Sequence, residues 1–118
     1  MKEENIIVDK SYAFALEVIR LAKLIREKRE YDLASQLWRA GTSIGANVEE
    51  AQAAQSRADF RSKMAIAAKE ARETSYWLRL TCDAKILDAD QVKPLLDEIE
   101  SIKRILTSIV KSTTPPLK

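Results

Sequence analysis

Apolar side chains recur every three or four positions along most of the chain, which is the period of an α-helix with one buried face. The first segment with this period covers about residues 11–28 and includes Phe14, Val18 and Leu21. Asp9 and Ser11, just before or at its start, are both residue types that cap helix N-termini. The pattern therefore predicts a first amphipathic helix of about five turns.

The same period returns three more times, over about residues 32–55, 59–84 and 90–111. Asp59 suits the N-cap of the third helix, and Asp88 or Asp90 suits that of the fourth. Pro94 falls within or just after the first turn of the fourth helix, where proline is tolerated. Connections this short make successive helices antiparallel. We expect residues 1–118 to form one all-α domain, an antiparallel up-down-up-down four-helix bundle, with a frayed tail over residues 112–118.

The scarcity of turn-forming residues supports the all-α class. The chain has two glycines and three prolines in 118 residues. A β-sandwich or barrel needs turn residues about every 8–12 positions, and a chain of alternating strands and helices needs them at strand ends. The chain has too few glycines and prolines for either pattern, so the all-β and the alternating α/β classes are excluded.

Several kinds of chemistry are excluded by residue types that the chain lacks. Histidine is absent, which removes imidazole acid–base catalysis and every His-ligated metal site. Glu50 and Glu70 occupy matching edges of two helices, but carboxylate di-iron sites also need histidines. An all-oxygen magnesium site on these carboxylates is the weaker alternative. We expect no enzymatic activity, no cofactor and no metal.

Compartment follows from cysteine usage and from the lengths of apolar runs. The single cysteine, Cys82, cannot form an internal disulfide and favours a reducing compartment. The longest apolar run, Met64–Ala68, is far too short to span a membrane. The N-terminal run is too short for the core of a signal peptide. We expect a soluble cytoplasmic protein with no membrane partner.

Both glycines lie inside the second predicted helix, where each costs about 1 kcal/mol relative to alanine. Gly41 and Gly45 share a face with Ala34, and Trp38 lies at its margin. Small residues in such a row allow another helix to approach closely. That helix belongs either to the same bundle or to a neighbouring subunit.

The third predicted helix is apolar around more of its circumference than a single core requires. Beyond its main stripe, Ile66, Trp77 and Leu80 gather on another side. An exposed apolar patch of this kind is typical of an interface, here with another copy of the chain. The alternative is a wide core that buries both sides.

Arginines form a stripe along the third predicted helix, within about 60° of one another on the helical wheel. The stripe is Arg57, Arg61, Arg72 and Arg79, and Arg20, Lys23 and Arg26 make a shorter basic stretch on the first helix. Guanidinium groups in a row suit the phosphates of RNA or DNA. The alternative is a solvated helix face, and the formal net charge of +2 is too small to decide.

One polar edge of the second helix holds Ser43, Asn47 and Glu50. We interpret these residues as a hydrogen-bond network at the border of the core that fixes the register of the helix.

The central part of the sequence carries a resemblance to a known family. The residues concerned are Arg39–Ala51, Asp59–Phe60, Lys63–Ala71 and Glu73–Leu78. They resemble the bacterial four-helix-bundle family of proteins encoded in intervening sequences of 23S ribosomal RNA genes. That family is similar to the accessory variability determinant protein of retroelements, a basic pentamer that binds nucleic acid and a reverse transcriptase. Many relatives have glycine at the position of Ala51, and the alanine of this chain is the better helix former.

The resemblance implies a homopentamer of four-helix bundles with nucleic acid as the leading candidate ligand. It places Ser43, Asn47 and Glu50 on a structural motif, and it supplies no catalytic residue. We therefore expect a non-enzymatic oligomer that binds RNA or DNA through a repeated basic surface. The alternative is a protein-interaction scaffold, in which the arginine stripe contacts another subunit or a protein partner.

Overall fold

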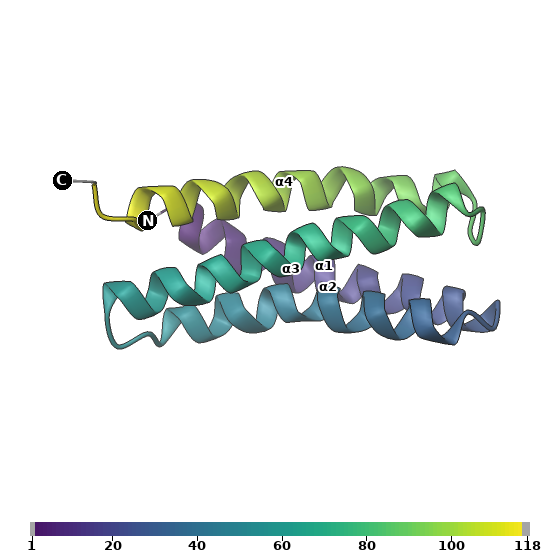
Figure 1. Cartoon of the computed structure of the whole chain (residues 1–118), viewed down its shortest axis with the longest axis horizontal. Helices are drawn as coiled ribbons and strands as arrows, with labels where there is room; N and C mark the ends of the chain where they lie inside the picture. Colours follow the sequence, from purple (N-terminus) through teal and green to yellow (C-terminus); the bar gives the residue numbers. More distant parts are fainter. Residues whose placement is uncertain (1, 117–118) are drawn as a thin grey trace.

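Four helices form where the apolar period runs, and the connections fall where it breaks. The structure, a computed structural model, describes the backbone of residues 2–116 and the side chains of residues 5–116. The helices are α1 (Lys2–Glu27), α2 (Tyr31–Gln52), α3 (Arg57–Asp83) and α4 (Ala89–Thr113) (Figure 1). No strand occurs in the described part of the chain. The predicted all-α four-helix bundle is confirmed.

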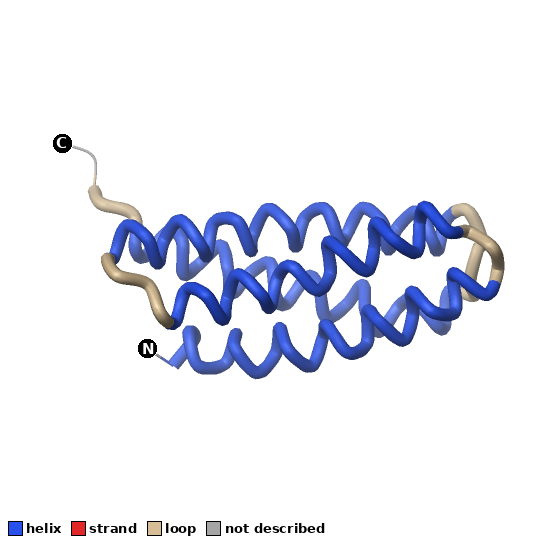
Figure 2. The backbone as a smooth tube through the Cα atoms, turned by 90° about the horizontal axis from the view of Figure 1, so that it is seen from below, coloured by secondary structure: helices blue, strands red, loops and turns tan. Residues whose placement is uncertain are grey.

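Each helix packs against two others, so the bundle is a four-cornered rod of 50 × 23 × 23 Å. α1 and α3 both contact α2 and α4, whereas α1 and α3 lie at diagonal corners, as do α2 and α4. Figure 2 shows the four helices running side by side with the loops gathered at the two ends. One face of every helix fills the shared core, in which the largest fully buried side chains include Phe14, Leu21, Leu37, Met64, Leu78, Ile99 and Leu106.

The predicted start of α1 is wrong by nine residues, because the helix begins at Lys2 rather than near Ser11. Ile7 is fully buried and extends the apolar stripe by two turns. Ser11 is not an N-cap: it is buried, and its hydroxyl donates a hydrogen bond to the carbonyl of Val8 inside the helix. Lys10 pairs with Glu98 of α4 at 3.1 Å. Contacts with the rest of the bundle therefore keep the chain helical through Asp9 and Ser11, although these residue types are typical of a helix start.

The other helix ends differ from prediction by one to three residues. α2 ends at Gln52 instead of Gln55. α3 begins two residues before Asp59 because Ser56 is the N-cap, and its hydroxyl accepts a hydrogen bond from the backbone N–H of Asp59 at 3.0 Å. Asp88 precedes α4 as predicted, with its N–H bound to the Gln91 side chain.

The expected frayed tail is partly wrong. α4 continues to Thr113, which is buried and donates a side-chain hydrogen bond to the carbonyl of Ile109. Residues 114–116 leave the helix, and residues 117–118 of the predicted tail lie outside the described part.

The turns after α1 and α3 have the same construction. Arg29 and Lys85 adopt left-handed conformations, with φ of 65° and 59°. In each turn the next residue's N–H reaches a carbonyl five residues back, from Glu30 to Ile25 and from Ile86 to Thr81. This is the arrangement in which glycine is usual, and a residue with a Cβ adopts it at a cost of about 1 kcal/mol.

The two glycines pack against α1 of the same chain, which decides between the two interpretations of the glycine face. A Cβ on Gly41 would lie 2.5 Å from a methyl carbon of Val18. A Cβ on Gly45 would lie 3.3 Å from the backbone oxygen of Ser11. Ala34 is buried on the same side of α2. The row of small residues is thus the seam where α2 meets α1 inside one bundle.

Substitution of Gly41 by alanine is expected to destabilise the protein by about 1–3 kcal/mol, because the new methyl group overlaps the branched side chain of Val18. This loss outweighs the gain of about 1 kcal/mol in helix propensity. Val18→Ala makes room, so the double variant should be more stable than the sum of the single effects by about 1 kcal/mol. Urea unfolding of the four proteins measures this coupling. A Gly41→Ala variant more stable than the parent would contradict the seam.

Candidate nucleic-acid interface

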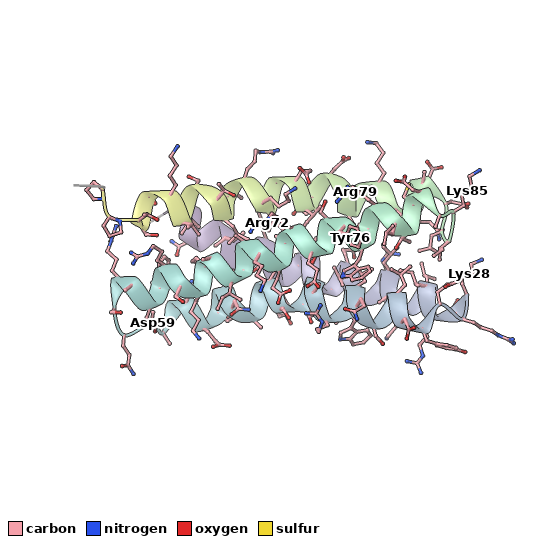
Figure 3. All side chains as sticks on the ribbon, in the orientation of Figure 1. Lys28, Asp59, Arg72, Tyr76, Arg79 and Lys85 are labelled. Carbon is pink, nitrogen blue, oxygen red and sulfur yellow. The ribbon has the colours of Figure 1, made fainter. Side chains whose placement is uncertain are left out.

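The arginine stripe lies on the side of α3 that faces α4, where Ala68 and Ser75 at the same angular position are buried. Arg72 and Arg79 follow one another along this side of α3, with Tyr76 beside them (Figure 3). The guanidinium of Arg79 lies 5.9 Å from the ring centroid of Tyr76. From Arg57 to Arg79 the stripe extends about 33 Å. It therefore follows most of the long axis of the rod.

Carboxylates do not neutralise most of this stripe. Arg57, Arg72 and Arg79 form no ion pair with any carboxylate among the described side chains. Arg57 and Arg72 are also exposed. Exposed cations without partners keep their donors available for phosphate oxygens.

α4 adds cations to this face that sequence reasoning missed. Arg104 and Lys111 are exposed on α4 and have no carboxylate partner in the described part of the chain. Lys93 and Lys103 also belong to α4 but pair with Asp97 and Glu100 of their own helix. We call the surface formed by Arg57, Arg72, Arg79, Arg104 and Lys111 the basic face. Sequence reasoning missed it as a whole because it could not show that α3 and α4 are neighbours, and α3 alone supplies three of these cations and α4 two.

Arg61 differs from the other members of the stripe. It is half-buried, and its guanidinium donates a hydrogen bond of 2.8 Å to the carbonyl of Thr113 at the end of α4. Arg57 and Arg61 line an open hollow with Ser112 and Thr114 at this end of the rod. Arg61 thus joins α3 to the end of α4, so its substitution would disturb the fold as well as the surface.

The three basic residues of α1 do not join the basic face. α1 lies diagonally across the bundle from α3, so Arg20, Lys23 and Arg26 point away from the stripe. Arg20 pairs with Glu17 at 3.0 Å. Lys23 and Arg26 instead line a groove between α1 and α2. The seven basic residues predicted as one set are therefore divided between two surfaces.

The residues predicted as an oligomer or close-packing surface also separate. Ala34, Gly41 and Gly45 lie inside the bundle, as described above. Ile66 and Leu80 remain 39% and 38% exposed on α3, and Trp77 is half-buried between α2 and α3. On the diagonal helix, Tyr12 and Leu16 are 64% and 54% exposed. Trp77 packs against the core, whereas the other four side chains are largely outside it. Trp38, 43% exposed, is a wall of the groove between α1 and α2.

The polar edge of α2 forms fewer mutual contacts than predicted. The hydroxyl of Ser43 donates to the carbonyl of Arg39, and the amide of Asn47 donates to the carbonyl of Ser43. Glu50 is exposed and pairs with Lys63 of α3 at 3.4 Å. The expected network is therefore a series of bonds to the helix's own backbone and one ion pair between helices, because helical spacing brings these short side chains to carbonyls four residues back.

Arg39 connects α2 to two carboxylates of α3. It lies 2.7 Å from Glu73 and 3.6 Å from Glu70. The hydrogen bond from Arg39 lowers the pKa of Glu73 below its ordinary value. Burial raises the pKa of Glu70, and the adjacent Glu73 raises it further. One cation therefore serves two carboxylates, and the more buried of them is the less satisfied.

The carboxylates considered for a metal site have cations of other helices beside them. Glu50 and Glu70, which were considered for magnesium, each lie beside a cation of a neighbouring helix. The described residues contain no group of three metal-ligating side chains. None of their helices is both long and apolar enough to cross a bilayer.

The fold and its surface define a four-helix bundle with a basic face. Residues 3–108 match the family model of the 23S rRNA-intervening sequence protein, and the chain belongs to that family. A solved structure from Bacteroides thetaiotaomicron, described as a protein with unknown function from the S23 ribosomal protein family, is 43% identical to it. The match covers 92% of this chain and 98% of that one, with a TM-score of 0.87. No curated protein matches the chain.

Replacement of Glu70 and Glu73 by glutamine should change stability in opposite directions. A lowered pKa means that the charged form of Glu73 stabilises the fold above its ordinary pKa, so Glu73→Gln should cost up to about 0.5 kcal/mol at pH 7 after solvent screening. A raised pKa means that charged Glu70 opposes folding at pH 7, so Glu70→Gln should be stabilising.

Urea unfolding at pH 7 and near pH 3 measures both effects. The two variants should converge toward the parent as the pH falls below both carboxyl pKa values, because the parent then carries neutral groups at these positions too. Equal losses in both variants at pH 7 would contradict the assigned directions.

Proposed function

We propose that this protein is a non-enzymatic homo-oligomer that binds RNA or DNA through the basic face. The observation that carries the proposal is the set of unpaired cations on adjoining sides of α3 and α4, beginning with Arg57 and Arg72. On the border of α2 and α3, by contrast, Arg39 is paired with Glu73 and Lys63 with Glu50. The lone Cys82 agrees with a reducing compartment, so we place this activity in the cytoplasm.

Phosphate binding adds up over contacts, because each neutralised phosphate releases condensed counterions. The straight stripe of about 33 Å on α3 presents its cations along a line, as a nucleic-acid backbone presents its phosphates. No recognition helix with base-reading side chains accompanies it, so we expect little sequence preference. The family is named for a sequence within 23S rRNA, which favours RNA as the first ligand to test.

Self-association would repeat this face several times on one particle. Exposed apolar side chains on two diagonal helices of the rod include Tyr12 and Leu16 on α1 and Ile66 and Leu80 on α3. Two different patches on opposite sides suit a head-to-tail contact, which closes into a ring when the rotation allows it. We propose a homopentamer, as the resemblance to the family implies.

A second candidate function is a protein-interaction scaffold. The apolar patches on α1 and α3 favour it, since exposed patches also receive partner proteins. In this case the arginines would contact acidic residues of another subunit or of a protein partner.

Charge reversal at Arg72 and Arg79 is expected to weaken RNA binding by at least about tenfold at low salt and to reduce the salt slope by about two. A charge-matched control reverses Lys28 and Lys85, which lie at one end of the rod (Figure 3). Fluorescence anisotropy with a labelled RNA, at several salt concentrations, measures both quantities. If both double variants bind RNA equally weakly, the effect comes from net charge and the basic face is not the binding site. If the Arg72 and Arg79 variant dissociates into monomers, the scaffold function is favoured.

The head-to-tail contact predicts an unusual complementation. Leu16→Glu should break one patch and Leu80→Glu the other, so that each variant alone sediments as a 13.4 kDa monomer. Mixed together, they retain one intact pair of patches and should form dimers. Sedimentation equilibrium distinguishes these species from wild type, expected at five times the monomer mass. Monomeric wild type, or a mixture that stays monomeric, would contradict the arrangement.

A further inference from the structure

A groove of about 330 Å³ lies between α1 and α2, on the side of the bundle away from the basic face. Its apolar lining consists of Ala22, Ala34 and the ring of Trp38. The alanines are nearly fully buried, whereas Trp38 is 43% exposed. The small residues that bring α1 and α2 together thus leave the indole ring beside an open hollow.

Cations surround this hollow. Lys23 and Arg26 line it from α1, and neither forms an ion pair with a carboxylate among the described side chains. Arg26 is held in place by the ring of Tyr31, with its guanidinium carbon 5.7 Å from the ring centroid. Arg39 lines the groove from α2, although its charge is shared with Glu73. An aromatic wall beside two free cations is complementary to a ligand that joins a planar ring to a negative charge.

We propose that this groove binds an unpaired nucleotide of single-stranded nucleic acid, with the base stacked on Trp38 and the phosphates at Lys23 and Arg26. Stacking on an exposed aromatic ring with cations along the backbone is the means by which proteins bind single strands without reading sequence. A base in a duplex already has neighbours on both of its faces, so the groove selects single strands. The inference rests on the proposed function insofar as the chain binds nucleic acid, but it uses different residues.

The test uses Trp38 as its own reporter. In a Trp77→Phe background, Trp38 is the one remaining tryptophan of the chain. This change breaks no hydrogen bond, because the ring nitrogen of Trp77 is buried without a partner, and phenylalanine keeps an aromatic ring against the core. A 20-nucleotide oligouridine should quench the fluorescence of Trp38 at low salt, and an RNA duplex of the same length should leave it unchanged.

Affinities for the labelled oligouridine then assign the contacts. Trp38→Ala should lower the affinity about tenfold, whereas Trp38→Phe, which keeps a stacking surface, should retain most of it. Lys23→Gln should reduce the salt slope by about 0.7, and the control Lys28→Gln, just beyond the end of α1, should leave it unchanged. Sedimentation of each variant should match the parent.

The outcomes separate this inference from the proposed function. If Trp38→Ala loses single-strand binding while reversal of Arg72 and Arg79 leaves it intact, the groove stands and the basic face fails. If Trp38→Ala binds as the parent does and oligouridine quenches nothing, the groove fails whatever the basic face does. Equal quenching by the duplex, or dissociation of the oligomer on loss of Trp38, would likewise overturn the inference.

Discussion

The close contact between α1 and α2 is the constraint on which the rest of the bundle depends. At Gly41 there is no room for one more carbon because Val18 occupies the space, and at Gly45 an added carbon would press against the backbone of Ser11. This contact fixes how far α1 lies from α2, and hence where Phe14 and Val18 enter the core. It also positions Lys10 for its ion pair with Glu98 of α4. The contact with α2 thus orients α1 toward its second neighbour, α4. The loss in helix propensity at each glycine is offset by this packing.

Much of the fold could be predicted from the sequence because helical periodicity is a local property. The stripe on each helix, the antiparallel order and the cap at Asp88 all follow from residues near one another in the chain. The start of α1 could not be predicted, because Asp9 and Ser11 have the chemistry of caps, and only the burial of Ile7 and Ser11 shows that the helix runs through them. Ser56 and Asp59 are both suitable caps, and only backbone geometry decides between them.

The candidate site was predictable to the same extent. The angular alignment of Arg57, Arg72 and Arg79 is set by their spacing on one helix. What periodicity cannot give is the identity of the neighbour, and it therefore missed both the contribution of Arg104 from α4 and the use of Arg61 to hold Thr113. Nor could it show that the basic residues of α1 lie at the corner of the bundle diagonal to the stripe. The formal net charge of +2 conceals this division, because Arg39 and Lys63 are paired with carboxylates between α2 and α3, whereas the cations of the basic face are unpaired in the described part of the chain.

An even number of antiparallel helices returns the chain to the end of the rod where it began. The N-terminus of α1 and the C-terminus of α4 therefore lie at the same end, near the turn between α2 and α3 (Figure 1). Anything fused to either terminus, such as a purification tag or a fluorescent protein, would stand beside Arg57 and Arg61 and far from Lys28 and Lys85. A short peptide could also join the two termini, and the chain could then be opened at the opposite end without severing any helix.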